Sequence, residues 1–216
     1  MKRVIIIHRW SGGARDDWRP WLASALEKMG YIVSMPEMPD RDVPIIQKWV
    51  EKIAEIVGTP DAETFFVGHS IGCQAILRYL ETIYVQVGGA VFVAGWFALE
   101  HLEDEETRKI AQPWVETPMN LKKIKSVLPM STLMISDNDP YDCLEENKKR
   151  FADIVTNERI VPSAGHFTAE DGVTGQTIRV YFGPALVGGS RFSGATANGA
   201  LYVDESTNVG KYTQTI

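Results

Sequence analysis

Apolar and polar positions along the chain follow two alternating periods. Short apolar runs rich in β-branched residues are typical of buried strands, and longer stretches with an apolar residue every three or four positions are typical of amphipathic helices. The predicted strands are Val4–Ile7, Tyr31–Met35, Thr64–Val67, Gly89–Val93, Thr132–Ile135 and Glu158–Val161. The predicted helices are Trp18–Met29, Val43–Val57, Ile71–Tyr84 and Cys143–Val155. This alternation predicts an α/β domain with a mostly parallel sheet and helices on both of its faces.

The pattern changes near residue 174. Beyond it, strand-like pieces at Ile178–Phe182, Ala200–Val203 and Tyr212–Ile216 are separated by glycine-containing turns, and no amphipathic helix follows. Short strand-like segments separated by glycine-containing turns are typical of β-hairpins. We therefore divide the chain into a domain over residues 1–175 and a β-rich C-terminal extension over residues 176–216. Because unpaired strand edges tend to pair, we expect this extension to form a homo-oligomer, with folding back onto the domain as the alternative.

Composition narrows the class of partner. The 216 residues are 44% hydrophobic and 23% charged, and no apolar run approaches the ~20 residues of a membrane span, so we expect no membrane partner. Acidic residues outnumber basic ones by 28 to 22, and the net charge of −6 disfavours a nucleic acid as the partner. Met1-Lys2-Arg3 leads into an apolar run too short for a signal peptide, which predicts a cytoplasmic location.

Metal and cofactor signals are missing from the sequence. Cys73 and Cys143 are the two cysteines, and neither belongs to a CxxC pair or a Cys/His cluster. Gly172–Val180 faintly resembles the terminal segment of short-chain dehydrogenases, but no glycine-rich phosphate loop follows Val4–Ile7. We therefore expect no metal and no cofactor.

One pentapeptide carries the strongest chemical signal. Gly68-His69-Ser70-Ile71-Gly72 lies directly between a predicted strand and a predicted helix, the setting of a G-x-S-x-G nucleophile elbow. Glycine is needed on both sides because the sharp turn brings backbones too close for a Cβ. The turn projects the Ser70 hydroxyl above the sheet and puts the Ile71 backbone N–H where it can stabilise an oxyanion. Ser70 is therefore the predicted nucleophile and Ile71 a predicted oxyanion donor.

A nucleophilic serine needs a base and a carboxylate, which follow an elbow serine in the order acid, then histidine. His166, in a small-residue loop after the last predicted strand of the domain, is the histidine in that position. For the acid, Asp137 and Asp139 compete in the segment after Thr132–Ile135. We favour Asp139 because Pro140 holds the preceding residue in an extended conformation. Asp137 remains the alternative, with an Asx-turn as its structural role.

The loop after the first strand is expected to supply the second oxyanion donor. We assign it to the backbone N–H of Trp10 and expect the His8 side chain to brace this loop by hydrogen bonds. Trp10, Trp96 and Phe97 follow predicted strands, which makes them candidates to line an apolar acyl pocket. Aromatic side chains are found in protein cores more often than at ligands, so core positions are the competing interpretation.

Together these segments resemble the small, lidless serine hydrolases similar to retinoblastoma-binding protein 9 and the bacterial YdeN-type hydrolases. The resemblance covers about residues 3–173 and is carried by Val4–Gly13, Asp17–Leu22, Met35–Pro39, Val67–Gly72, Ser136–Tyr141 and Gly165–Phe167. It implies a compact α/β-hydrolase fold with Ser70, Asp139 and His166 as a triad and a preference for small esters or amides. It also favours Asp139 over Asp137, because the Asp-Pro position matches the family acid.

The chain departs from that family at two places. Arg9 follows His8 where members often have glycine, and a side chain there would narrow or charge the oxyanion loop. Family members usually end with a helix after the histidine loop, where this chain has strand-like segments instead. The extension over residues 176–216 is therefore an interface element, an arm over the substrate or a fusion segment.

The sequence thus predicts a carboxylesterase-like serine hydrolase that cleaves small carboxylic esters or amides by two-step acyl transfer. In this interpretation His166 takes the Ser70 proton, Asp139 holds the imidazole tautomer, and water releases the acyl group. Two alternatives stay open at this point. One is a non-catalytic binding module on the same fold, and the other is an acyltransferase or perhydrolase that uses the same triad with a different acceptor.

Overall fold

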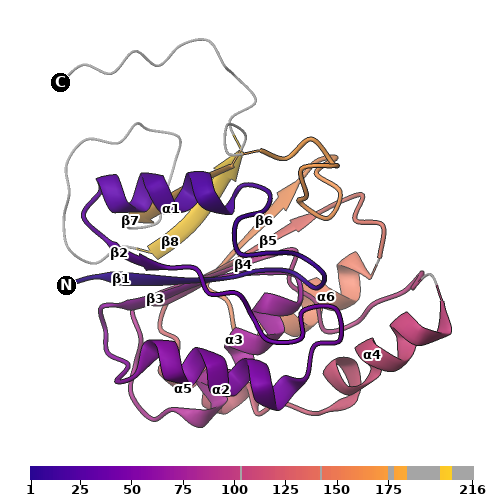
Figure 1. Ribbon diagram of the computed structural model, residues 1–216, viewed down its shortest axis with the longest axis horizontal. Helices are drawn as coiled ribbons and strands as arrows, with labels where there is room; N and C mark the ends of the chain where they lie inside the picture. The colour runs from indigo at the N-terminus through magenta and orange to yellow at the C-terminus, as the bar shows by residue number, and fades with distance from the viewer. Residues whose placement is uncertain (103, 142, 175–177, 184–199, 206–216) are drawn as a thin grey trace.

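The computed structural model describes residues 1–102, 104–141, 143–174, 178–183 and 200–205. Six parallel strands form one sheet in the order β2-β1-β3-β4-β5-β6 (Figure 1). They are β1 (Arg3–Ile7), β2 (Ile32–Ser34), β3 (Thr64–His69), β4 (Gly89–Val93), β5 (Ser131–Ser136) and β6 (Asn157–Val161). The helices of the described residues are α1 (Arg19–Lys28), α2 (Ile46–Val57), α3 (Ile71–Thr82), α4 (Glu105–Glu116), α5 (Leu121–Val127) and α6 (Leu144–Phe151). Every strand and helix predicted for residues 1–175 is present, with ends that shift by a few residues.

The sheet separates two hydrophobic cores. Along β1, Ile5 and Ile7 belong to one core and Val4 and Ile6 to the other, as the two-residue period of a strand requires. The first core contains buried side chains of α2 through α6, whereas the second contains those of α1. Because both faces are covered, the inner strands β1, β3, β4 and β5 each contain a run of apolar residues instead of alternating with polar residues, whereas the edge strand β6 is mostly polar.

Two helices were not predicted from the sequence. In α4 the buried residues are Ala111 and Trp114, and Pro113 interrupts the pattern, so no continuous apolar stripe is visible. The helix begins instead with an N-cap, because the Asp104 carboxylate accepts the backbone N–H of Thr107 at 2.7 Å. α5 is only seven residues long and is capped in the same way by Asn120.

The C-terminal extension contributes an antiparallel pair of strands, β7 (Ile178–Gly183) and β8 (Ala200–Glu205). β8 lies beside β4 and β5, whose edges are already paired within the sheet, so the hairpin lies against a face of the sheet. β7 lies beside α1 on that same side (Figure 1). This backbone placement favours the fold-back alternative. The predicted strand Tyr212–Ile216 lies outside the described residues.

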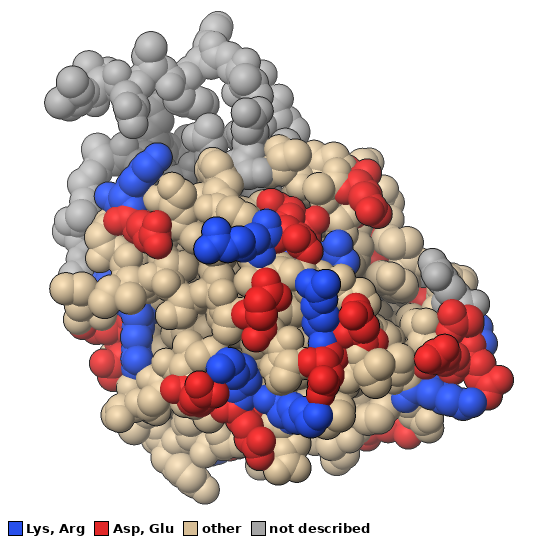
Figure 2. Space-filling model, in the orientation of Figure 1, with Lys and Arg blue, Asp and Glu red and all other residues tan. Residues whose placement is uncertain are grey.

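Charged side chains of both signs are interspersed on the face shown in Figure 2. Exposed ion pairs such as Lys48–Asp40 and Lys52–Glu55 contribute at most about 1 kcal/mol each, so the free energy of folding comes mainly from the two cores. Within the described residues, no helix is both long and apolar enough to cross a membrane.

Candidate active site

Ser70 occupies the tight turn between β3 and α3. Its φ of 54° and ψ of −121° are a strained combination for an L-residue, which only a rigid environment maintains. A Cβ on Gly68 would lie 2.7 Å from the backbone nitrogen of Cys73, and a Cβ on Gly72 would lie 2.6 Å from the carbonyl oxygen of Ile7. The close approach of these backbones therefore requires both glycines, for the reason that the motif predicts.

His166 and Asp139 are joined by a hydrogen bond. The Nδ1 of His166 lies 2.8 Å from Oδ2 of Asp139, and both side chains are 11% exposed. The other oxygen of Asp139 accepts the backbone N–H of Tyr141 at 3.0 Å, and the Tyr141 ring packs edge-on against the imidazole. With the carboxylate at Nδ1, the proton of the neutral ring resides there, and Nε2 remains an acceptor.

Asp137, the competing carboxylate, is engaged elsewhere. Its Oδ1 accepts the backbone N–H of Ser163 at 2.7 Å. The neighbouring Asn138 accepts the backbone N–H of Gly165 at 2.8 Å. Both side chains therefore brace the end of β5 against the loop that carries His166, while Asp139 contacts the imidazole itself.

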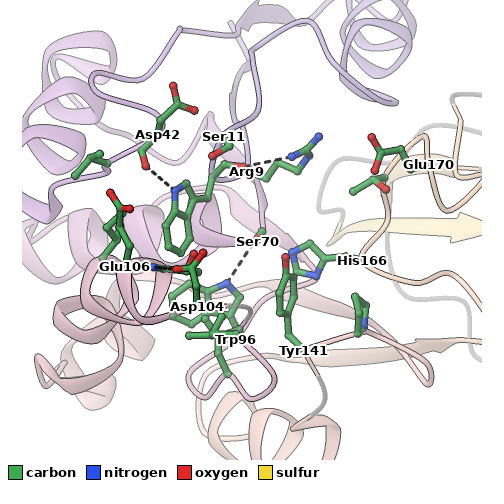
Figure 3. A pocket seen from close by; sticks show the side chains of 18 of the residues that line it. Arg9, Ser11, Asp42, Ser70, Trp96, Asp104, Glu106, Tyr141, His166 and Glu170 are labelled. Atoms are coloured by element: carbon green, nitrogen blue, oxygen red, sulfur yellow. Dashed lines mark hydrogen bonds between the residues drawn. The ribbon is translucent and has the colours of Figure 1, made fainter.

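Trp96 makes a polar contact with Ser70, in addition to the apolar lining role predicted for it. Its indole N–H donates to Oγ of Ser70 at 3.3 Å (Figure 3). Among the described residues, Ser70 makes no hydrogen bond with His166, although both line one cavity. The indole uses a lone pair of the hydroxyl oxygen, so the hydroxyl proton stays available for Nε2 of His166. Such contacts often tighten only when substrate is bound.

The backbone N–H groups of Trp10 and Ile71 are available to a ligand. Among the described residues, neither donates to another protein atom. Ile71 is the first residue of α3, where N–H groups have no intrahelical acceptor. The Trp10 loop is held in place because its indole N–H donates to the carbonyl of Asp42 at 3.0 Å.

His8 braces the same loop, in agreement with the expectation from sequence. Its Nε2 accepts the backbone N–H of Met38 at 2.9 Å, so the ring proton lies on Nδ1 and is donated to the carbonyl of Arg9 at 2.7 Å. Burial lowers the pKa of His8, which keeps the ring neutral. The Arg9 side chain lines the cavity and pairs with Asp17 at 3.2 Å.

A cavity of about 560 Å³ opens over Ser70 and His166. Aromatic and aliphatic side chains form part of its wall, namely Trp10, Val43, Trp96, Leu99, Leu102, Ile110 and Tyr141. Five carboxylates also line it, namely Asp42, Asp104, Glu106, Glu170 and Asp171, and Arg9 is the one cationic side chain among the described lining residues. Figure 3 shows Asp104 and Glu106 on the α4 side of the cavity and Glu170 on the opposite side. No sequence pattern predicted this acidic lining.

Phe97 is a correction to the predicted pocket. It is 1% exposed, belongs to the first core and is not among the lining residues of the cavity. Its ring centroid lies 4.7 Å from that of Phe151, and the Asn147 amide oxygen accepts its backbone N–H at 2.7 Å. The chain after β4 therefore directs Trp96 toward Ser70 and Phe97 into the core.

Other reactive groups near the elbow are inert. Cys73 is fully buried, and burial raises the pKa of its thiol well above the usual range, which keeps it protonated. The described residues contain no group of three or more His, Cys, Asp or Glu side chains placed to hold a metal ion. Of the three residues predicted as a triad, Ser70 and His166 line the cavity, and Asp139 is hydrogen-bonded to His166.

Comparisons with known proteins agree with this geometry. A sequence model of the family described as "Serine hydrolase" matches residues 4–178. The putative hydrolase YdeN of Bacillus subtilis is 26% identical over 175 residues, which are 80% of this chain and 90% of YdeN. The serine hydrolase RBBP9 of Rattus norvegicus is 29% identical over 142 residues, or 64% of this chain and 73% of that protein. The crystal structure of the B. subtilis ydeN gene product superposes with a TM-score of 0.73 over 81% of this chain and 92% of its own.

Proposed function

The chain belongs to the serine hydrolase family, and from this premise we propose that it hydrolyses small carboxylic esters or amides through an acyl-enzyme formed on Ser70. One observation carries the proposal. His166, which is hydrogen-bonded to Asp139, lines the same cavity as a serine held in a strained strand-to-helix turn. The protein has the α/β-hydrolase fold and is an enzyme of the hydrolase class.

In the proposed reaction, Nε2 of His166 accepts the Ser70 proton as Oγ bonds to the carbonyl carbon of the substrate. The carbonyl double bond opens to an oxyanion, which then collapses and breaks the bond to the leaving alcohol or amine as the imidazolium gives that group its proton, and the acyl group remains on Ser70. Water then bonds to the acyl carbon as His166 removes its proton, and collapse of the second oxyanion breaks the bond to Ser70 Oγ, which takes the proton back from His166 and releases the carboxylic acid. Asp139 keeps Nδ1 protonated and stabilises the imidazolium through both half-reactions.

The oxyanion is proposed to bind the backbone N–H groups of Trp10 and Ile71. Both lack a protein acceptor among the described residues, and the N-terminus of α3 adds a favourable dipole at Ile71. The indole N–H of Trp96 is a third donor within reach of the reacting oxygen atoms. As the Ser70 oxygen loses its proton, this N–H stabilises the negative charge that develops on it.

The cavity sets the expected substrate class. A volume of about 560 Å³ suits a small molecule rather than a protein segment. The carboxylates that line it repel acyl or leaving groups that carry a negative charge, and this repulsion makes the free energy of binding less favourable. We therefore propose uncharged or cationic small esters and amides as substrates.

A fluorophosphonate probe tests the proposal. Such a probe phosphonylates only an activated serine, so we expect the wild-type protein to be labelled at Ser70 and the Ser70→Ala variant to remain unlabelled. The same pair is then assayed with short p-nitrophenyl esters, where Ser70→Ala is expected to abolish turnover without changing the circular dichroism spectrum.

The outcomes separate the competing functions. A wild-type protein that binds esters but is neither labelled nor active would be a binding module. Labelling with slow hydrolysis, and faster ester turnover when an alcohol, amine or peroxide is added as acceptor, would identify an acyltransferase or perhydrolase. Activity that survives in Ser70→Ala would overturn the proposal.

A further inference from the structure

Two consecutive residues, Asp17 and Trp18, contact the backbone of the loop that carries His166, and the next residue, Arg19, reaches it through His69. Oδ1 of Asp17 accepts the backbone N–H of Ala169 at 3.0 Å. The indole N–H of Trp18 donates to the carbonyl of Phe167 at 3.0 Å. These contacts join positions about 150 residues apart in sequence, and none of the three side chains is among those that line the cavity. The triplet therefore lies behind the catalytic histidine rather than beside a substrate.

Arg19 reaches the same loop through the residue before the nucleophile. Its Nη1 lies 2.9 Å from Nδ1 of His69, and Nε2 of His69 lies 2.8 Å from the carbonyl oxygen of His166. A guanidinium can only donate, so Nδ1 of His69 accepts and the ring proton resides on Nε2. That proton is the one the His166 carbonyl accepts. Arg19 thus selects the His69 tautomer that can hold the His166 backbone.

The charge of Arg19 is buried to an unusual degree. The side chain is fully buried, and its partners are Oδ2 of Asp17 at 3.1 Å and the carbonyl of Gly13 at 2.8 Å. Its Nε has no hydrogen-bond partner among the described residues. Burial, with the Arg19 charge acting in the same direction, holds the pKa of His69 well below its usual range. A buried guanidinium is costly, and an apolar side chain of similar volume often gives a more stable protein, so stability alone is a weak reason for this arrangement.

The histidine loop has a backbone that needs such support. Phe167 has a φ of 58°, a conformation that L-residues other than Asn and Asp seldom adopt, and Gly165 has a φ of 53°. Within the loop, Asp171 accepts the backbone N–H groups of His166 and Thr168. The contacts from Asp17, Trp18 and Arg19 restrain the loop from its other side.

We propose that Asp17, Trp18 and Arg19 are positioning residues, which hold the backbone of residues 166–169 so that the His166 imidazole stays between Asp139 and Ser70. This inference rests on the proposed function, in which His166 is the general base. It predicts that loss of a restraint lowers kcat and leaves KM unchanged, because the substrate cavity is untouched. A displacement of about 1 Å in a catalytic group can cost up to about 100-fold in rate.

Arg19→Met is the direct test, because it keeps the length of the side chain and removes the donors. We expect kcat for a p-nitrophenyl ester to fall by roughly 10- to 100-fold at constant KM, and Arg19→Lys to recover part of the loss. The matched control is Arg78→Met. Arg78 is also a buried arginine with an unpartnered Nε, but it donates to the carbonyls of Trp114 and Thr117, away from the histidine loop. We expect Arg78→Met to keep kcat within about twofold.

A second readout reports the mechanism directly. In wild-type protein with ¹⁵N-labelled histidine, NMR should show His69 as the neutral Nε2–H tautomer, and in Arg19→Met it should show a mixture of tautomers. A folded Arg19→Met variant with unchanged kcat, or an equal loss of kcat in Arg78→Met, would overturn the proposal. So would an unchanged His69 tautomer.

Should Arg19→Met fail to fold, Trp18→Phe keeps most of the aromatic volume and removes the N–H that the Phe167 carbonyl accepts. We expect kcat to fall about threefold to tenfold at constant KM, and an unchanged kcat would count against the positioning role. Ser70→Ala distinguishes a failure of the positioning proposal from a failure of the proposed function. If it abolishes activity while Arg19→Met and Trp18→Phe keep the wild-type kcat, the proposed function stands and the positioning proposal fails. If Ser70→Ala is active, the proposed function itself fails.

Discussion

Asp139 contacts the imidazole of His166 at 2.8 Å, whereas Asp137, two residues earlier, accepts a backbone N–H from Ser163. The two carboxylates share one short segment after β5 but have different chemical surroundings. One faces a ring nitrogen that must carry a proton, and the other faces a main-chain donor that never titrates. This difference allows the two positions to be separated by substitution.

Asp139→Asn should lower kcat by roughly 10⁴-fold, because the amide favours the wrong imidazole tautomer and leaves the imidazolium without a counter-charge. Asp137→Asn keeps an acceptor for Ser163 and should lower kcat by less than about tenfold. Steady-state hydrolysis of p-nitrophenyl acetate by both variants measures the difference. A larger loss in Asp137→Asn would transfer the acid role to that residue.

The acidic lining of the cavity predicts discrimination by charge. For p-nitrophenyl esters of matched acyl length, kcat/KM should be highest with a quaternary ammonium on the acyl chain, intermediate with a methyl group and lowest with a carboxylate. The spread should shrink as the ionic strength rises from about 20 mM to about 500 mM, because salt screens charges in an open cavity. Stopped assays at both ionic strengths measure it.

The matched variants for this charge prediction are Glu106→Gln, Glu170→Gln and Glu55→Gln. The first two lose a carboxylate from the cavity and should each reduce the preference for the cationic ester. Glu55 is exposed on α2 and pairs with Lys52, so its substitution should leave the preference unchanged. An order of substrates that is the same in all three variants and insensitive to salt would refute the role of the acidic lining.

Local sequence rules predicted the strands of the parallel sheet and four of the helices, and they selected Ser70 and His166, which the structure brings to one cavity. The period of β1 placed its side chains in two cores, and the glycines around Ser70 marked a turn that no Cβ could enter. Chain order then selected His166. These features depend on a few neighbouring residues, so a single sequence carries them.

Features that depend on distant contacts were missed or misplaced. The hydrogen bond from Trp96 to Ser70 and the hydrogen bonds that link Arg19 to His166 through His69 join different elements. No local sequence pattern predicts them. Phe97 could not be distinguished from Trp96, because both are aromatic and adjacent after β4. α4 was missed because a proline and a polar surface conceal a helix that capping and one buried tryptophan stabilise.

Two buried histidines should make the stability of the protein depend on pH. Burial lowers the pKa of both His8 and His69 from the ordinary value of 6.5, so the folded state keeps them neutral. The unfolded chain binds a proton at each below that pH, which favours unfolding. The free energy of unfolding should therefore fall as pH drops below 6.5, by up to about 1.4 kcal/mol per pH unit for each histidine.

Urea unfolding between about pH 7.5 and about pH 5.5 measures this slope before most carboxylates titrate. In His8→Gln the amide can still donate to Arg9 and accept from Met38, and the slope should fall by about half because one titrating group is gone. A slope that is the same in wild type and His8→Gln would show that His8 is charged in the folded state.

The β7–β8 hairpin supplies the last prediction, because its backbone lies against the sheet face that α1 also covers. Beneath it, β4 and β5 contribute Val91, Val93 and Met134 to the second core. A chain that ends at Thr174 would expose part of this apolar face to water, and such surfaces drive aggregation. We expect light scattering to show a defined particle for the full chain and aggregates for the shortened one.

The mass of the full-chain particle tests self-association: a dimer or larger would support the predicted homo-oligomer, and a monomer would leave the hairpin as a cover for its own domain. A shortened chain that remains a soluble, active monomer would contradict the covering role of the hairpin.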